Sequence, residues 1–177
     1  MTLPGKPHGK HPGAALTPTG NPMKDGMGPA AWNPDRADRP DYTHDGRPRM
    51  QPMSKLTGWS IEARDPDPHG MTVIGADGVA AGTVVDVWVD LAEPQLRYLQ
   101  VELPVEDQTD ILLPMGYCRI RRRDRTVRVK AIKSHHFPDV PRTRAPDKIT
   151  LLEEDKIVAY YAGGYMYADP SRSEPLF

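Results

Sequence analysis

The sequence has a single cysteine, Cys118, among 177 residues. One cysteine forms no intrachain disulfide and no paired-cysteine metal site, so nothing argues for an oxidising compartment. No apolar run reaches the roughly 20 residues that a membrane-spanning helix needs. The first residues, MTLPGKPHGKHPG, also lack the apolar segment of a secretory signal. Read literally, these absences predict a soluble, cytoplasmic chain.

Motifs of enzyme catalysis are missing as well. There is no glycine-rich phosphate loop after a strand and no G-x-S-x-G motif. Cys118 lies in an alternating run, which indicates a small core side chain rather than a nucleophile. The remaining polar residues are carboxylates, histidines and arginines, which carry protons without breaking bonds between heavy atoms. We therefore predict no enzyme activity and no metal ligation by this chain.

Proline divides the chain into regions. There are 20 prolines, about twice the usual share of roughly 5%, and ten of them precede residue 53. We expect residues 1–14 to be a flexible tail and residues 15–52 to be an extended segment that lies over another surface, either its own domain or a partner. The ordered domain is predicted over residues 53–168, and residues 169–177 form a second tail.

Two alternating apolar runs, residues 82–89 and 97–103, form the centre of the predicted domain. Their period of two predicts a β-hairpin. The turn between them carries two carboxylates, Asp90 and Glu93, with Arg97 close behind. One interpretation is an ordinary polar turn in which Arg97 is the ion-pair partner, which contributes little when exposed. The other is a site that carries protons.

Shorter patterns complete the predicted fold. Further strands are expected near residues 59–63, 71–74, 110–114, 117–121 and 126–132. A helix is expected from about residue 151 to 162, because Thr150 and Glu153 form a capping box and Gly163-Gly164 is a typical helix end. The fold class is therefore mainly β, a small antiparallel barrel or rolled sheet with one C-terminal helix and an extended proline-rich N-terminal segment.

Basic residues alternate with apolar ones in two of the late strands. They are Arg119, Arg121, Arg128 and Lys130. No aromatic residue interleaves with them for base stacking, and the net charge of the chain is −1. A solvated strand face or a contact with an acidic partner is therefore favoured over nucleic-acid binding.

Five longer motifs carry a resemblance to a known family. They are GNPMKDGMGPAAW (20–32), AGTVVDVWVDLAE (81–93), RYLQVEL (97–103), LLPMGYC (112–118) and ITLLEEDKIVAYYAGGYMYADP (149–170). In order and spacing they resemble the H subunit of the purple-bacterial photosynthetic reaction centre, over roughly residues 15–172. The resemblance implies a PRC-type β-barrel that caps the cytoplasmic face of the L and M subunits in the photosynthetic membrane.

The resemblance also implies a function. H subunits ligate no pigment, and bacteriochlorophyll, bacteriopheophytin, the quinones and the non-haem iron lie on L and M. The H subunit stabilises the assembly, shields the quinone sites and helps to deliver protons to the secondary quinone. The light-harvesting antenna is a candidate further partner. Family members usually carry one transmembrane helix. This sequence contains no apolar run of that length, so we expect peripheral attachment through the barrel and residues 15–52.

Individual site residues follow from the resemblance by position. Glu93 matches the family's acidic residue on the internal proton route, Asp90 matches a neighbouring carboxylate, and Arg97 matches a nearby basic residue. At the surface, the family has a histidine pair for proton entry; here His44 and Asp45 stand in that stretch. The alternative function is a free-standing PRC-barrel adaptor that binds RNA or protein through the basic strand face.

Overall fold

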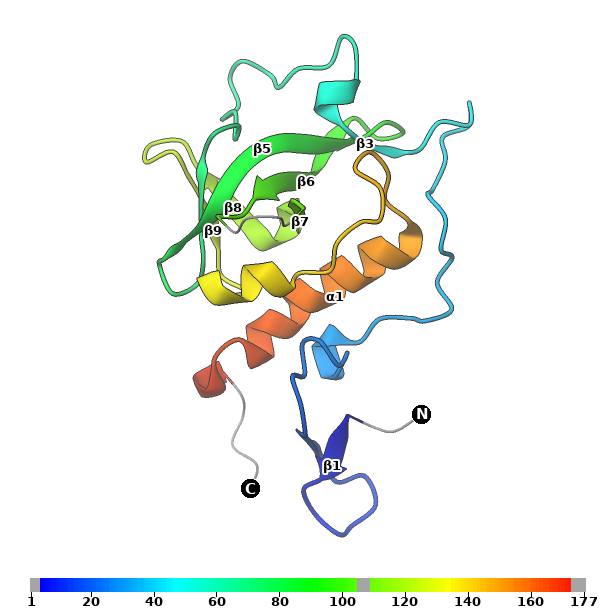
Figure 1. Cartoon of the computed structure of the whole chain (residues 1–177), viewed down its shortest axis with the longest axis vertical. Coiled ribbons are helices and arrows are strands. Elements are labelled where there is room, and N and C mark those ends of the chain that lie inside the picture. Colours follow the sequence, from blue (N-terminus) through cyan, green and yellow to red (C-terminus); the bar gives the residue numbers. More distant parts are fainter. Residues whose placement is uncertain (1–3, 105–108, 173–177) are drawn as a thin grey trace.

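The computed structural model describes residues 4–104 and 109–172. In these residues a seven-stranded sheet packs over one long helix, and a separate two-stranded hairpin lies at the N-terminal end (Figure 1). The strands are β1 Gly5–Pro7, β2 Leu16–Pro18, β3 Met50–Pro52, β4 Thr72–Ile74, β5 Ala80–Asp90, β6 Gln95–Glu102, β7 Ile111–Pro114, β8 Cys118–Arg121 and β9 Thr126–Val129. The helices are η1 Gly28–Ala30, η2 Met53–Lys55, η3 Met115–Tyr117, η4 Ser134–Asp139, α1 Leu151–Tyr167 and η5 Pro170–Arg172.

The central hairpin is confirmed as the antiparallel pair β5 and β6. Its alternation is less regular than the sequence predicts, because the register shifts between Val84 and Asp86. The shift leaves Val85 as an extra residue between two paired ones, and beyond it every residue from Asp86 to Asp90 is buried. Such an irregularity bends a strand and increases its twist, which helps the sheet to roll around its core.

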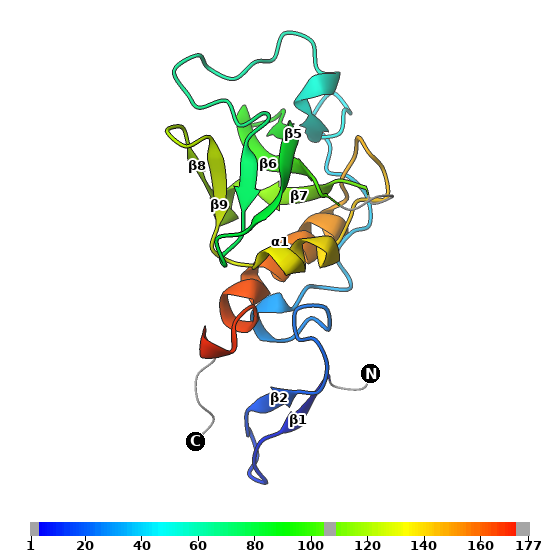
Figure 2. The same cartoon turned by 60° about the vertical axis from the view of Figure 1, so that its left-hand side comes forward.

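The remaining strands extend the sheet in the order β7-β6-β5-β4-β9-β8, and β3 pairs with the end of β5 (Figure 2). The prediction of a mainly β fold is confirmed, but one pair, β4 with β9, is parallel rather than antiparallel. Among the described residues β7 and β8 do not pair, so hydrogen bonds do not close the roll. The strand predicted at residues 59–63 is wrong: this stretch is a loop that packs over the open seam.

Helix α1 begins as predicted and ends later than predicted. Thr150 Oγ1 accepts from Glu153 N at 3.1 Å, and Glu153 Oε2 accepts from Thr150 N at 2.9 Å, which completes the capping box. The helix continues past 162 to Tyr167. A Cβ atom on Gly163 would lie 2.5 Å from the Cβ of Ala30, and one on Gly164 would lie 2.4 Å from Ile132. These glycines allow close packing of the helix rather than ending it.

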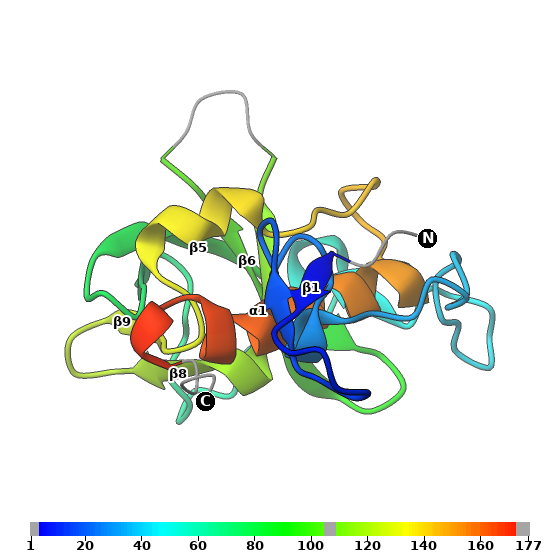
Figure 3. The same cartoon turned by 90° about the horizontal axis from the view of Figure 1, so that it is seen from below.

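The N-terminal segment packs on its own domain. Strand β1 pairs with β2, so the boundary predicted between residues 14 and 15 falls inside a hairpin. Ala30 and Met23 are buried, and η1 lies against α1 (Figure 3). Farther along, the backbone of residues 37 and 39 accepts hydrogen bonds from the first turn of α1. Contact of this segment with partner subunits stays a prediction.

No helix in the described parts of the chain is long and apolar enough to cross a membrane.

Candidate functional site

A buried ion pair fixes the tip of the β5–β6 hairpin. Asp90 ends β5 and its side chain is fully buried. Arg49 Nε donates to Asp90 Oδ1 at 2.8 Å, and Arg49 Nη2 donates to Asp90 Oδ2 at 2.7 Å. Strand β3, which begins one residue after Arg49, places the guanidinium here because Met50 pairs with Asp90. Two parallel bonds from arginine to a carboxylate give both strength and a fixed orientation.

Both members of this pair stay charged. Burial by itself raises the pKa of Asp90, but hydrogen bonds from Arg49 and from the backbone of Glu93 and Ala92 outweigh it and hold the pKa below its usual value. The hydrogen bond to Asp90 in turn raises the pKa of Arg49. Asp90 is therefore an ionised anchor at neutral pH rather than a group that takes up and releases protons.

Glu93 is the exposed carboxylate of the tip, with 66% of its side chain open to solvent. Its backbone N–H donates to Asp90 Oδ1 at 3.1 Å, so the buried anchor sets its position. Its side chain has weaker partners: Oε1 lies 3.4 Å from Arg49 Nη2, and Oε2 accepts from Gln95 Nε2 at 3.2 Å. The carboxylate is therefore attached to a fixed backbone and is accessible to water.

Arg97 does not pair with either tip carboxylate. It is exposed on β6, and its charge acts on Glu154, whose pKa it lowers in part. The interpretation of Arg97 as the ion-pair partner of the tip is wrong. Arg49 takes that place, because strand pairing brings it to Asp90 from 41 residues away.

Glu154 and Tyr98 form a second polar pair that sequence reasoning missed. Tyr98 Oη donates to Glu154 Oε1 at 2.7 Å. Burial raises the pKa of Glu154, against the hydrogen bond from Tyr98 and the charge of Arg97. Asp41 links the two sites, since it lies 3.5 Å from Arg49 and its charge also raises the pKa of Glu154. The only signal at Glu154 in the sequence is its place in the first turn of the predicted helix, where a negative charge is favourable. That signal says nothing about Tyr98.

His44 and Asp45 lie in a tight turn between residues 43 and 47. Asp45 accepts hydrogen bonds from Thr43 and from Arg47, the latter at 2.7 Å, and these bonds lower its pKa. His44 is exposed. Among the described residues no hydrogen bond or ion pair joins His44 to Asp45 or to Glu93. The turn is nevertheless connected to the hairpin tip through Arg49. The backbone N–H of Arg49 donates to Asp41 O, which closes the turn, and its side chain binds Asp90 at the tip.

Comparison with known families decides what this arrangement belongs to. Residues 2–55 match the family model described as photosynthetic reaction centre, H-chain N-terminal region. Residues 61–136 match that of the PRC-barrel domain. The two matches follow one another and together span most of the chain.

The chain belongs to the reaction-centre H-chain family.

The predicted membership of the H-subunit family and the predicted PRC-barrel fold are thus confirmed. H chains of this family are structural, membrane-associated subunits that associate with other reaction-centre subunits. The site spans both matched regions: Asp41, His44 and Arg49 come from the H-chain match, whereas Asp90 and Glu93 come from the PRC barrel. The ion pair between Arg49 and Asp90 therefore ties the two regions together.

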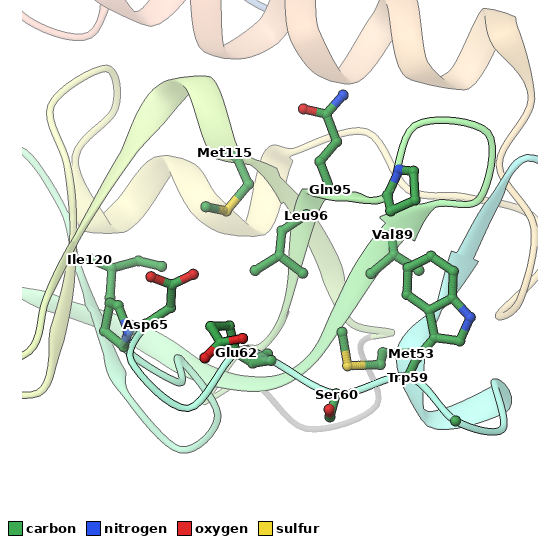
Figure 4. Close-up of a pocket in the computed structure, with 14 residues that line it drawn as sticks. Met53, Trp59, Ser60, Glu62, Asp65, Val89, Gln95, Leu96, Met115 and Ile120 are labelled. Atoms are coloured by element: carbon green, nitrogen blue, oxygen red, sulfur yellow. The ribbon is translucent and has the colours of Figure 1, made fainter.

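An apolar pocket of about 640 Å³ adjoins the tip of this H chain. Val89 and Gln95 from the hairpin line it, and Leu96 lies near its centre (Figure 4). The indole of Trp59 lies toward one end and the carboxylates of Glu62 and Asp65 toward the other (Figure 4). It opens where the sheet does not close.

Cys118 packs against the core, and burial raises the pKa of its thiol to about 12. The side chain is therefore a neutral thiol at physiological pH, in agreement with its predicted role in packing. In the described residues no group of three or more histidine, cysteine or acidic side chains is placed to hold a metal ion.

Proposed function

We propose that this H chain caps the cytoplasmic face of the L and M subunits, stabilises the quinone sites and passes protons toward the secondary quinone through Glu93. One observation carries the proposal: an exposed carboxylate lies at the tip of a rigid hairpin, and the buried pair of Asp90 and Arg49 fixes its backbone. In this proposal the pigments, the quinones and the non-haem iron are held by L and M, and the H chain ligates none of them.

The chemistry of quinone reduction suits such a carboxylate. Reduction creates negative charge in a region of low dielectric constant, and the protons that neutralise it come from water on the far side of the protein. A carboxylate covered by a partner, next to that charge, shifts toward the protonated form. A group whose pKa approaches the working pH both accepts and gives up protons readily. Glu93 is exposed in the free chain, so docking supplies the burial.

The neighbouring residues take different parts in this proposal. Asp90 positions Glu93 and stays ionised, which its buried bond to Arg49 supports. Asp41 and Glu154 extend the row of carboxylates along the domain. His44 and Asp45 serve proton entry at the surface, and Arg97 acts through the charge that it places beside Glu154.

The apolar pocket beside the tip supports docking on this side of the domain. Leu96 and Trp59 line a hollow that reaches Pro94 in the hairpin turn, so a partner that fills it lies next to Glu93. Burial of apolar area supplies the attraction, and the polar tip then faces the partner's interior. The membrane face is thus the face of the hairpin tip.

The substitution Glu93→Gln in the assembled complex tests the proton role. We expect the proton-coupled second electron transfer to the secondary quinone, measured by flash kinetics, to slow by at least about tenfold, because a positioned proton-transfer group typically contributes roughly 10²–10⁴-fold. Glu62→Gln is a matched control, because Glu62 is another exposed carboxylate beside the same pocket. Normal kinetics in an intact Glu93→Gln complex would remove Glu93 from the route.

The alternative function, a free-standing adaptor, predicts a different result on purification. Co-purification of subunits that absorb in the near infrared supports the reaction-centre role. Recovery of the chain with RNA and without pigment favours the adaptor.

A further inference from the structure

The β8–β9 hairpin concentrates the positive charge of the chain. Residues 118–130 carry seven arginine and lysine side chains and one carboxylate, whereas the rest of the chain carries 16 basic and 23 acidic side chains. The formal charge is therefore +6 in these 13 residues and −7 elsewhere. This separation gives the hairpin a strong positive potential although the whole chain is close to neutral.

Arg119 and Arg128 lie directly opposite each other on the two strands. Like charges at opposed positions destabilise a sheet, so folding alone does not favour this pair. With Arg121 and Lys130 they line a groove of about 390 Å³, and Tyr165 of α1 contributes to its lining. Figure 3 shows the end of α1 beside the hairpin. The cost of the opposed charges points to a ligand that neutralises them.

The acidic side chains near this groove neutralise little of its charge. Asp124 lies 3.6 Å from Arg128, and both side chains are almost half exposed, so the pair contributes little. Asp77 is occupied, because its carboxylate accepts bonds from the backbone N–H and the hydroxyl of Ser134. Within the described residues no ion pair is made by the other groove cations, Arg119, Arg121 and Lys130.

Strand β8 is the last strand of the sheet, and its outer edge borders the open seam that the loop of residues 59–66 covers (Figure 2). The arginines of β8 instead lie on the solvent side of the sheet, because Arg119 and Arg121 are exposed whereas Ile120 between them lines the pocket at the seam. Side chains two positions apart on a strand lie about 7 Å apart on one face. Arg119 and Arg121 thus match carboxylates at alternate positions of an extended peptide. We propose that the basic groove on the solvent side of β8 and β9 binds an acidic, extended segment of a partner protein.

The aromatic side chains at the groove favour a protein partner over RNA. Tyr117 stacks on Tyr161, with 5.7 Å between the ring centroids, and its ring centroid lies 6.0 Å from that of Tyr165. Binding of single-stranded RNA relies on ring faces that are open to the bases. The ring of Tyr117 is half-buried beside those of Tyr161 and Tyr165, so among the groove-lining residues only Tyr165, which is 49% exposed, offers an open ring, and successive bases need several.

The position of the groove favours a partner in solution over a lipid surface. The groove borders the turn before β5, whereas Glu93 follows the other end of that strand. Eleven residues of strand separate the two ends, about 35 Å at the usual rise, and β5 crosses the domain between them (Figure 1). This step rests on the proposed function: when Glu93 faces the quinone site, the groove faces away from the membrane.

Fluorescence anisotropy with the full chain tests the proposal. The probe is a labelled ten-residue peptide of alternating threonine and glutamate, and its control has the same composition with the five glutamates in one block. We expect the alternating peptide to bind at least about tenfold more tightly than the block peptide. The double substitution Arg119→Glu and Arg121→Glu should weaken binding by about tenfold or more, since it places like charges across the contact.

Two further variants sharpen the test. Lys130→Glu reverses a groove cation outside β8 and should weaken binding as well. The control Lys6→Glu with Arg36→Glu makes the same change in net charge at exposed sites of the N-terminal segment and should leave affinity within about twofold. Equal binding of the two peptides, or unchanged affinity after reversal of Arg119 and Arg121, would overturn the proposal.

Tighter binding of a ten-nucleotide oligouridine, or of vesicles that contain phosphatidylglycerol, would overturn the assignment of a protein partner. These measurements need only the isolated full chain. The Glu93→Gln kinetics need the assembled complex, so a failure of this proposal and a failure of the proposed function are told apart.

Discussion

Arg49 and Asp90 form a two-point ion pair in which the carboxylate is fully buried and the guanidinium is 26% exposed. The pair joins the N-terminal segment to the end of the central hairpin, and Asp90 also receives the backbone N–H groups of Ala92 and Glu93. It therefore stabilises the fold and positions the candidate proton carrier at the same time.

Removal of Arg49 should be strongly destabilising. The change Arg49→Ala leaves the Asp90 carboxylate buried without its cation, and loss of one partner of a buried pair costs about 3–5 kcal/mol. Urea unfolding of the full chain measures the loss. The control Arg47→Ala removes an exposed arginine that pairs with Asp45, and should cost less than about 1 kcal/mol. A similar small loss for both variants would contradict a structural role for the Arg49 pair.

Stability near this pair should depend on acid in a defined direction. The folded pKa of Asp90 is lowered, so its contribution is fully present above the unfolded value of about 3.9 and is lost as the pH falls through the folded value. We expect Asp90→Asn to destabilise the protein at pH 7, with the difference from the wild type shrinking in strong acid. A difference that is constant across this range would exclude the linkage.

Glu154 should show the opposite dependence. Burial raises its folded pKa, so the folded state binds the proton more tightly and stability falls as the pH rises from the unfolded value of about 4.3 through the folded value. Glu154→Gln keeps an acceptor for Tyr98 without the charge, and we expect it to unfold at higher temperature than the wild type at pH 7. The gain should disappear near pH 4.

The matched control for Glu154 is Glu102→Gln, at an exposed carboxylate of β6. Thermal unfolding of both variants at several pH values separates a local effect of burial from a general effect of net charge. A gain of the same size in Glu102→Gln would assign the effect to net charge.

Gly163→Ala should destabilise the protein although alanine is the better helix former by about 1 kcal/mol. The added methyl would lie 2.5 Å from Ala30 Cβ, and overpacking of this kind costs about 1–3 kcal/mol. Thermal unfolding measures the change. The second substitution Ala30→Gly removes the opposing methyl and should restore part of the stability. A stabilising Gly163→Ala would show that Gly163 is not needed for close packing of α1 against Ala30.

Much of the fold and part of the site follow from local sequence pattern. Alternation in residues 82–89 and 97–103 was enough to predict the hairpin, and the capping box at Thr150 predicted the start of α1. These features depend on residues close in sequence, as do the two carboxylates of the turn. The motifs also carried the family, which the two matched regions confirm.

The tertiary structure alone decided which residues act on one another. Arg49 reaches Asp90 across 41 positions, and Tyr98 reaches Glu154 across 56. The glycine pair at Gly163 predicted a helix end. Its actual role, close packing against Ala30, joins parts of the chain that are distant in sequence and leaves no local signal. Periodicity reports which side of an element is buried, but it carries no information about the distant segment that covers it. Packing between distant segments therefore decided which side chains pair. It also decided that Asp90 is the buried anchor of the tip and Glu93 its exposed carboxylate.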